Sequence, residues 1–317
     1  MTLTLMELPN DKHPNSAVPR DGHGRPLVIP PCGGRPTALT RTTTFIDCIE
    51  DKSNLATWKQ RETLRGAAMQ PGLLDAVADL DPSSPADKRK LTALAERAAD
   101  VAGANRASSQ GTRLHTLSEY VDRGDPLPSG ITSEELADMA AYMVETCELR
   151  MLSVEQFVVV PELAVGGTFD RTAELTGRPC PSAGCPGRHI VDLKTGSMEY
   201  GTVKMPAQLA IYSRGQKYDH TMFPAPNRAE DEKAWEKWKR TEVPAAEAAM
   251  AYTPLADICQ DWGIVIHLPQ GKATCTLHWA DLRKGWELAL FAKDVRARRK
   301  TRDTLIPFGV DSVAPGV

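Results

Sequence analysis

Residues 190–196 read Ile-Val-Asp-Leu-Lys-Thr-Gly, an apolar run interrupted by an acid and a base. Such a run is typical of a buried strand, on which successive side chains point to opposite faces. Asp192 and Lys194 are therefore expected to share one face, while Val191 and Leu193 pack on the other. Buried charges are costly unless they are paired. The pair is either a salt bridge at a sheet edge, which is the commoner arrangement, or a ligand and its neighbour beside a divalent cation.

A second acidic strand is predicted shortly before the first. The run Gly-Gly-Thr-Phe-Asp-Arg ends at Arg171, and residues 167–175 alternate in the manner of a strand. If this strand pairs with the one that holds Asp192, its own Asp170 can share a hard cation such as Mg²⁺ with that residue. Taken alone, Asp170 would equally fit a carboxylate at a turn or a strand end.

Two predicted helices add polar side chains. Gln208 and Tyr212, the ends of the run Gln-Leu-Ala-Ile-Tyr, stand one turn apart on one helix face. His115 ends the run Gly-Thr-Arg-Leu-His, and because helical side chains lean toward the N-terminus it is expected to lie over Gly111. Singly, the Gln/Tyr pair fits packing at a rim, and a lone histidine more often belongs to a core or a surface than to a metal site.

The remaining sequence predicts helices first and strands later. Residues 1–36 are rich in proline and poor in apolar periodicity, which predicts an extended or disordered arm. Residues 37–150 predict a helical region that packs on the core and carries the histidine motif. Residues 151–317 predict three strands, a helix, a late hairpin and a final helix. This order indicates an α/β or α+β fold, with 37–317 forming one domain.

Local signals set the expected element positions. Ser84 before Pro85 is typical of a helix start, and Thr132 with Glu135 forms a capping box. Gly124 is typical of a helix end. The pattern predicts helices over 55–69, 85–102, 109–123, 132–149, 206–217 and 284–300, and strands over 157–160, 167–175, 189–194, 264–266 and 274–279.

The charge balance excludes some classes of protein. Lys and Arg total 38 and Asp and Glu total 41 in 317 residues, a formal net charge of −3. This excludes a uniformly basic architectural DNA-binding protein and a long acidic tail. Nucleic acid remains open as a substrate, because bound cations and a local basic patch can supply positive charge.

In chain order, the patterns Gly-x-x-x-His, Gly-x-x-Asp, Asp-x-Lys-Thr-Gly and Gln-x-x-x-Tyr resemble the RecB-like exonuclease branch of the PD-(D/E)xK nuclease superfamily. That branch includes RecB/AddB nuclease domains, phage exonucleases and CRISPR-associated RecB-like exonucleases. The resemblance covers residues 111–212 directly. It implies a restriction-endonuclease-like α/β fold, with a mixed β-sheet core flanked by helices and an N-terminal helical region.

The resemblance also implies an activity, that of a metal-dependent DNA exonuclease in phage or bacterial DNA recombination, repair or replication. Asp170, Asp192 and Lys194 would be the catalytic residues. His115, the two aspartates and the backbone carbonyl of Leu193 would hold Mg²⁺ or Mn²⁺, and Lys194 would orient water or stabilise the transition state. The side chains that would contact DNA are Gln208, Tyr212, Arg171 and Thr195.

Two other functions stay open at this point. A structure-specific or site-specific endonuclease would share the fold, and a non-catalytic DNA-binding or interaction protein would use a degenerate copy of it. The Gln-x-x-x-Tyr pattern favours the exonuclease, and the intact set of Asp170, Asp192 and Lys194 argues against degeneration. DNA is the expected substrate, and a single-strand annealing or other recombination protein is a partner by analogy only. The oligomeric state is open.

The seven cysteines are scattered, which argues against a disulfide scaffold and favours a reducing compartment. Some relatives hold an iron–sulfur cluster on one early and three closely spaced late cysteines. Here the late ones are Cys259 and Cys275, so we expect no such cluster. Cys180, Cys185 and His189 are candidate zinc ligands, but a structural site normally needs four. The sequence therefore favours a proline-rich loop with free thiols over a zinc site.

The chain also lacks the sequence signals of membrane proteins and secreted proteins. No run approaches the roughly 20 apolar residues of a membrane span. The first residues lack the basic and apolar regions of a secretion signal. We therefore expect a cytoplasmic protein, in a bacterial cell or a phage-infected host, without a membrane partner.

Overall fold

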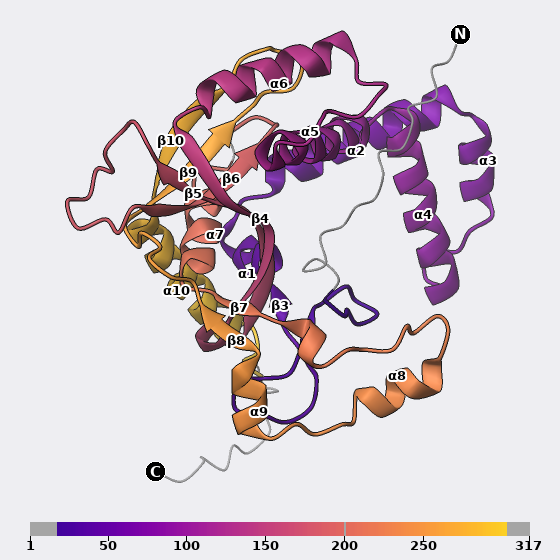
Figure 1. Ribbon diagram of the computed structural model, residues 1–317. Helices are drawn as coiled ribbons and strands as arrows, with labels where there is room; N and C mark the ends of the chain where they lie inside the picture. The colour runs from indigo at the N-terminus through magenta and orange to yellow at the C-terminus, as the bar shows by residue number, and fades with distance from the viewer. Residues whose placement is uncertain (1–17, 200, 303–317) are drawn as a thin grey trace, which may run out of the picture.

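The computed structural model describes residues 18–199 and 201–302, apart from the side chains of residues 107 and 108. At its centre lies one mixed sheet with helices on both sides (Figure 1). The strands of this sheet are β3 (Thr40–Arg41), β4 (Leu149–Val160), β5 (Val165–Leu175), β6 (Arg188–Lys194), β7 (Gln216–Tyr218), β8 (Tyr252–Pro254), β9 (Trp262–His267) and β10 (Thr276–Asp281). A separate pair is formed by β1 (Leu27–Val28) and β2 (Thr37–Ala38).

The sheet has the order β10-β9-β6-β5-β4-β7-β8, and β3 pairs with β5 beside this path. β6 and β9 run parallel, whereas β4, β5 and β6 are antiparallel neighbours. The predicted α/β class, with a mixed sheet between helices, is confirmed. The helices are α1 (Thr42–Ile46), α2 (Ser53–Met69), α3 (Gly72–Ala78), α4 (Pro85–Val101), α5 (Arg106–Arg123), α6 (Ser133–Glu145), α7 (Lys204–Ser213), α8 (Glu232–Trp238), α9 (Ala245–Met250) and α10 (Leu282–Arg298).

The alternation of β6 determines which helices cover which face. Val191 and Leu193 belong to a buried cluster with Leu117 of α5 and with α6. Ile190 belongs to a different cluster, with Leu209 of α7 and the start of α10. The prediction that Val191 and Leu193 pack together on one face is confirmed. Because both faces of β6 are covered, Asp192 and Lys194 near its end lie close to the core.

Apart from α1, which packs on α7 and β5, the helices before β4 fall into two groups. α5 and α6 pack on the sheet, whereas α2, α3 and α4 pack chiefly on one another, and α3 and α4 stand apart from the sheet (Figure 1). α2 and α4 approach so closely that a Cβ at Gly66 would collide with the Ala98 carbonyl group. The helical region predicted for residues 37–150 therefore contains a projecting group, α2 to α4, followed along the chain by a layer that covers the sheet, α5 and α6.

Most predicted helix boundaries agree with the structure. Ser84 caps α4 through the Asp87 N–H, and the capping box of Thr132 and Glu135 is present. Gly124 ends α5 in the left-handed conformation, at φ 72°. These local signals depend on backbone hydrogen bonds within a few residues, so neighbouring elements do not alter them.

Three predicted boundaries are wrong because tertiary pairing overrides the local pattern. The helix expected to reach residue 149 ends at Glu145, and β4 begins at Leu149, well before the predicted start at residue 157. The helix expected to reach residue 217 ends at Ser213. There the chain turns through Gly215, where a Cβ would lie 2.7 Å from the Val158 side chain, and pairs with β4.

Residues 18–36, predicted as part of an extended or disordered arm, contain a short strand and turns and pack against the sheet. Val18 and Val28 are buried in a cluster with Phe157 of β4. The Ile29 N–H donates to the Tyr218 hydroxyl at 3.0 Å. The short apolar run at β1 is stabilised by this burial, although the surrounding prolines give the segment the composition of a tail. Residues 1–17 lie outside the described residues.

No helix within the described parts of the chain is long and apolar enough to cross a membrane.

The contact between α7 and α10 yields a stability prediction. A Cβ at Gly285 of α10 would collide with the Pro206 carbonyl oxygen of α7. Gly285→Ala should therefore lower the free energy of unfolding by about 1–3 kcal/mol, measured by urea denaturation. Gly72→Ala at the start of α3 is the matched control, because its Cβ would meet nothing within 4 Å. A Gly285→Ala protein as stable as the control would contradict this packing.

Candidate functional site

The candidate site lies where β5 and β6 separate. The pairing of the two strands extends to Arg171 opposite Val191 and no further in that direction. Beyond it, the Leu193 N–H donates to the Asp170 side chain, Oδ2, at 2.8 Å. In a strand, the N–H and C=O of one residue face the same neighbouring strand. The Leu193 carbonyl is therefore directed toward β5 and Asp170, as a cation ligand at this position would need to be.

Asp192 and Lys194 form an ion pair on β6, as expected for side chains two residues apart on a strand. The side chain of Asp192 is only 5% exposed and that of Lys194 is 31% exposed, so the lysine reaches outward from a buried acid. Asp192 Oδ2 is buried and, apart from this ion pair, has no hydrogen-bond partner of regular geometry among the described residues. A buried carboxylate oxygen with spare acceptor capacity fits a cation ligand.

α5 brings His115 to the same place. Its Nδ1 lies 3.5 Å from Asp170 Oδ2. One turn earlier, Gly111 faces the end of β6, where a Cβ would approach the Thr195 hydroxyl oxygen at 2.7 Å. The glycine of the Gly-x-x-x-His pattern therefore allows α5 to approach the Thr-Gly end of the strand. We expected this glycine to make room for His115, but in the structure its neighbour is Thr195.

Burial and neighbouring charges both shift the pKa values of the groups at the site. Burial raises the pKa of Asp192 to about 6, although the attraction of Lys194 opposes this. Burial also disfavours ionisation of Asp170, but His115, Arg171 and Lys194 together hold its pKa below the usual value. Burial lowers the pKa of His115, which favours a neutral imidazole with a free lone pair. Burial acts against the charge on Lys194, but the two aspartates raise its pKa overall, so it stays charged.

Tyr212 is near the site, but its side chain is not on the surface. It is 3% exposed, and its hydroxyl lies where a Cβ of Gly167 would come within 2.8 Å. Its ring packs against Phe169, with ring centroids 6.1 Å apart. The side chain of Gln208 adjoins the Tyr212 hydroxyl, and burial raises the pKa of that hydroxyl. Tyr212 therefore fixes α7 on β5, and Gln208, which is half-buried, is the member of the pair nearer to solvent.

Arg171 does not fit the expected contact with DNA. It is 1% exposed, and its guanidinium pairs with Asp122 and donates to the Ser118 hydroxyl at 2.5 Å. It also lies over the Tyr142 ring, 5.7 Å from the centroid. Its position on β5 directs it under α5, where the helix supplies the partners that a buried cation needs. Arg171 is thus a positioning residue beside Asp170, and it is not available to a phosphate group.

Glu155 is a carboxylate near the site that sequence reasoning missed. It lies on β4 between residues that pair with Arg171 and Phe169, and so stands opposite Asp170. Its φ of 52° is unusual for a residue other than glycine, and such backbone strain is concentrated at functional sites. Burial and the charges of Asp170 and Glu119 raise its pKa to about 8. In the sequence, the one signal that could have indicated Glu155 is its position just before the apolar run of β4.

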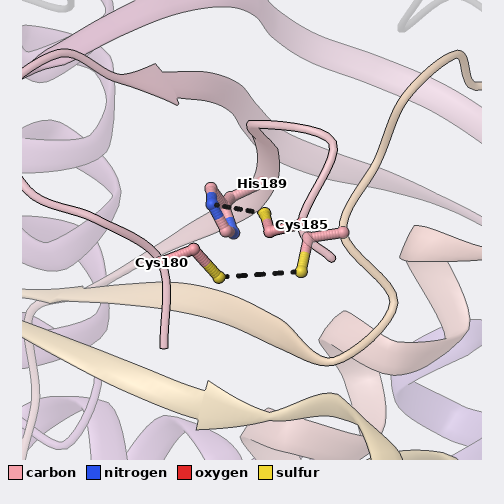
Figure 2. Close-up of side chains that lie close together, drawn as sticks. Cys180, Cys185 and His189 are labelled. Carbon is pink, nitrogen blue, oxygen red and sulfur yellow. Dashed lines mark hydrogen bonds between the residues drawn. The ribbon is translucent and has the colours of Figure 1, made fainter. Parts of the chain in front are cut away.

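A second group of predicted residues also comes together, away from the aspartates. The side chains of Cys180, Cys185 and His189 turn toward one another, as Figure 2 shows. Cys259, which comes just before β9, completes a set of four whose ligand atoms all lie within 4.8 Å of one another. The expectation that a fourth ligand is missing is therefore wrong. Cys259 lies 74 positions beyond Cys185 in the numbering, 259 − 185, so local spacing could not reveal it.

No protein-family model and no curated protein matches this chain. Function is therefore inferred from the residues and their geometry.

The burial of Arg171 leads to a prediction. Arg171→Met leaves the Asp122 carboxylate buried without its cation, and should lower the free energy of unfolding by about 3–5 kcal/mol, measured by urea denaturation. The control is Arg150→Met, which removes an exposed ion pair to Glu174 and should cost at most about 1 kcal/mol. If Arg171→Met left the stability unchanged but weakened DNA binding, the result would instead support the predicted contact between Arg171 and DNA.

The raised pKa of Glu155 gives a pH dependence. Its pKa rises from the usual 4.5 to about 8, so between these values the folded protein holds a proton that the unfolded chain releases. The free energy of unfolding should then fall as the pH rises through this window, by at most about 1.4 kcal/mol per pH unit. Denaturation without added divalent cations should show a flatter profile for Glu155→Gln.

The control for this experiment is Glu232→Gln, which changes a side chain that is 73% exposed and should keep the wild-type profile. Parallel profiles for the wild type and Glu155→Gln over the whole window would refute the assignment of the raised pKa.

Proposed function

We propose that the protein is a metal-dependent deoxyribonuclease of the RecB-like exonuclease type, built on a restriction-endonuclease-like core. The observation that carries this proposal is the meeting of Asp170, Asp192, Lys194 and His115 at the separation of β5 and β6. These residues come from three elements, α5, β5 and β6, and from three of the four short sequence patterns. An ordinary surface salt bridge would not require a buried second carboxylate and a histidine beside it.

The residues present fit a hard divalent cation. Asp170, Asp192 and the Leu193 carbonyl offer oxygen atoms, and the neutral imidazole of His115 is compatible with Mn²⁺ as well as Mg²⁺. The spare acceptor capacity of Asp192 Oδ2 supports this assignment. When bound, such a cation lowers the pKa of a water molecule and offsets the negative charge of the scissile phosphate. It would also offset the repulsion between Asp170 and Glu155.

The chain's own groups have separate tasks in this proposal. Lys194 keeps its proton and extends outward from Asp192, so its ammonium can hold the attacking water or stabilise charge on a phosphate oxygen. The Leu193 N–H keeps the Asp170 carboxylate in one orientation. Gln208 and Thr195 are half-exposed near the site and can contact the DNA strand. Tyr212 and Arg171 hold α7 and α5 in place around it.

The exonuclease reading is preferred to an endonuclease because of the Gln-x-x-x-Tyr pattern on α7. The biological role in phage or bacterial recombination, repair or replication, and a partnership with a recombination protein, are part of this proposal. A non-catalytic relative of the fold is disfavoured, since one of Asp170, Asp192 and Lys194 would be expected to be lost.

The test is digestion of end-labelled DNA by the full-length protein with Mg²⁺ or Mn²⁺. Linear DNA should be degraded from its ends and closed circles should persist. Asp192→Asn and Lys194→Met should each lower the rate by roughly 100-fold or more, because each removes a charge at the reacting phosphate. Asp294→Asn on α10, whose side chain is 55% exposed, is the control and should match the wild type.

The choice of DNA substrate distinguishes the exonuclease from the endonuclease and from the non-catalytic protein. Cleavage of closed circles that disappears in Asp192→Asn would replace the exonuclease with an endonuclease at the same site. DNA binding with no hydrolysis under any divalent cation would favour the non-catalytic protein. Hydrolysis at the wild-type rate by both variants would refute the site altogether.

A further inference from the structure

The cluster of Cys180, Cys185, His189 and Cys259, here called the cysteine–histidine cluster, lies outside the nuclease site. Cys180 and Cys185 belong to the loop between β5 and β6, and His189 is near the start of β6. Asp192 and Lys194 are at the other end of the same strand. His189 is fully buried and Cys259 is 1% exposed. Cys180 and Cys185 are half-buried, so the cluster is covered on its inner side, and it is not needed for the chemistry proposed above.

Its distances match a tetrahedral metal ion. Cys180 Sγ lies 4.0 Å from Cys259 Sγ, and Cys185 Sγ lies 3.5 Å from His189 Nε2. Zinc–sulfur bonds of about 2.3 Å at tetrahedral angles place two sulfur atoms roughly 3.8 Å apart. A zinc–nitrogen bond is shorter, so the sulfur–nitrogen separation should be smaller than this. The observed sulfur–nitrogen distance is indeed shorter than the observed sulfur–sulfur distance.

The histidine is already oriented as a ligand. His189 Nδ1 lies 2.9 Å from the Trp262 carbonyl oxygen. Because a carbonyl only accepts, Nδ1 must carry the proton, which leaves the lone pair of Nε2 facing the sulfur atoms (Figure 2). Metal-binding histidines characteristically donate their other ring N–H in this way. Burial lowers the pKa of His189, so the ring is neutral.

Backbone N–H groups surround the sulfur atoms. Ser182 N–H donates to Cys180 Sγ at 3.4 Å, and Gly187 N–H donates to Cys185 Sγ at 3.4 Å. Each donor follows its cysteine by two residues, which is a local turn at each ligand. Such bonds stabilise negative charge on sulfur. A loop with two unrelated free thiols would have no reason to direct both turns toward one point.

We propose that Cys180, Cys185, His189 and Cys259 bind a structural zinc ion. Three thiolates and one imidazole suit Zn²⁺, and four protein ligands leave no open position for catalysis. The ion would fasten the loop between β5 and β6 to the segment that leads into β9. A backbone hydrogen bond already joins the start of β6 to this segment, since the Cys259 N–H donates to the Arg188 carbonyl at 2.7 Å.

Two other fates of the cluster are less consistent with the structure. A disulfide between Cys180 and Cys259 needs sulfur atoms about 2.05 Å apart, so the chain would have to move, and the histidine would have no role. A four-iron cluster is held by four thiolates, and here the fourth ligand is an imidazole in a set compact enough for one ion.

The test begins with the full-length wild type, purified without chelators and dialysed. Elemental analysis should find one equivalent of zinc per chain. Growth with cobalt should give the absorption of a tetrahedral Co²⁺ site with thiolate charge-transfer bands. Neither measurement depends on activity or on a variant. Absence of both signals, a stoichiometric content of iron and sulfide, or a Cys180–Cys259 disulfide in non-reducing peptide mapping would each overturn the proposal.

Variants then assign the ion to this cluster. Cys259→Ser should reduce bound zinc to a small fraction of one equivalent, whereas Cys147→Ser, an exposed cysteine elsewhere, should keep it. Asp192→Asn should also keep the zinc, which separates this cluster from the nuclease site. Should Cys259→Ser fail to fold, Cys185→Ser and the cobalt spectrum of the wild type still decide the question. Zinc retained in Cys259→Ser but lost in Asp192→Asn would refute the proposal.

Discussion

The Leu193 N–H donates to the Asp170 carboxylate instead of to a carbonyl group of β5. This bond marks the place where β5 and β6 stop pairing, and the candidate site exists because of that separation. On its other side β6 remains paired with β9 as far as Lys194. One edge of β6 is therefore held by the sheet while the opposite edge offers backbone groups and carboxylates. A continuous ladder would use the same backbone groups for pairing.

α5 and α7 approach this opening at two glycine positions, where no side chain is in the way. Gly111 brings α5 against Thr195, and Gly167 gives the Tyr212 hydroxyl of α7 a place against β5. These glycines are in the same short patterns as the functional residues, which explains the spacing of Gly-x-x-x-His and Gly-x-x-Asp in physical terms. A Cβ at either position would have to displace a neighbouring side chain, and the helix carrying the polar group would shift with it.

The sequence was sufficient to predict features that depend on local periodicity. The alternation of β6, the caps at Ser84 and Thr132, and the mixed order of helices and strands are of this kind. Features that depend on distant partners could not be predicted. Arg171 is buried because Asp122 of α5 pairs with it, and β4 extends back to Leu149 because β5 is available to pair with it. The candidate catalytic residues were found through their order along the chain, but Glu155 was missed because it belongs to no pattern.

The two ends of β6 are related through strand register. A slip of one residue against β9 would direct Asp192 and Lys194 toward α5 and α6, and Val191 and Leu193 toward α7. The hydrophobic pattern of β6 opposes such a slip. However, the strand has only seven residues and carries buried charges near its end, which weakens its preference for the observed register. His189 lies at the opposite end, with its ring bonded to the Trp262 carbonyl of β9. A metal ion that joins His189 to Cys259 would fix that register without any contact with the candidate site at the other end of the strand.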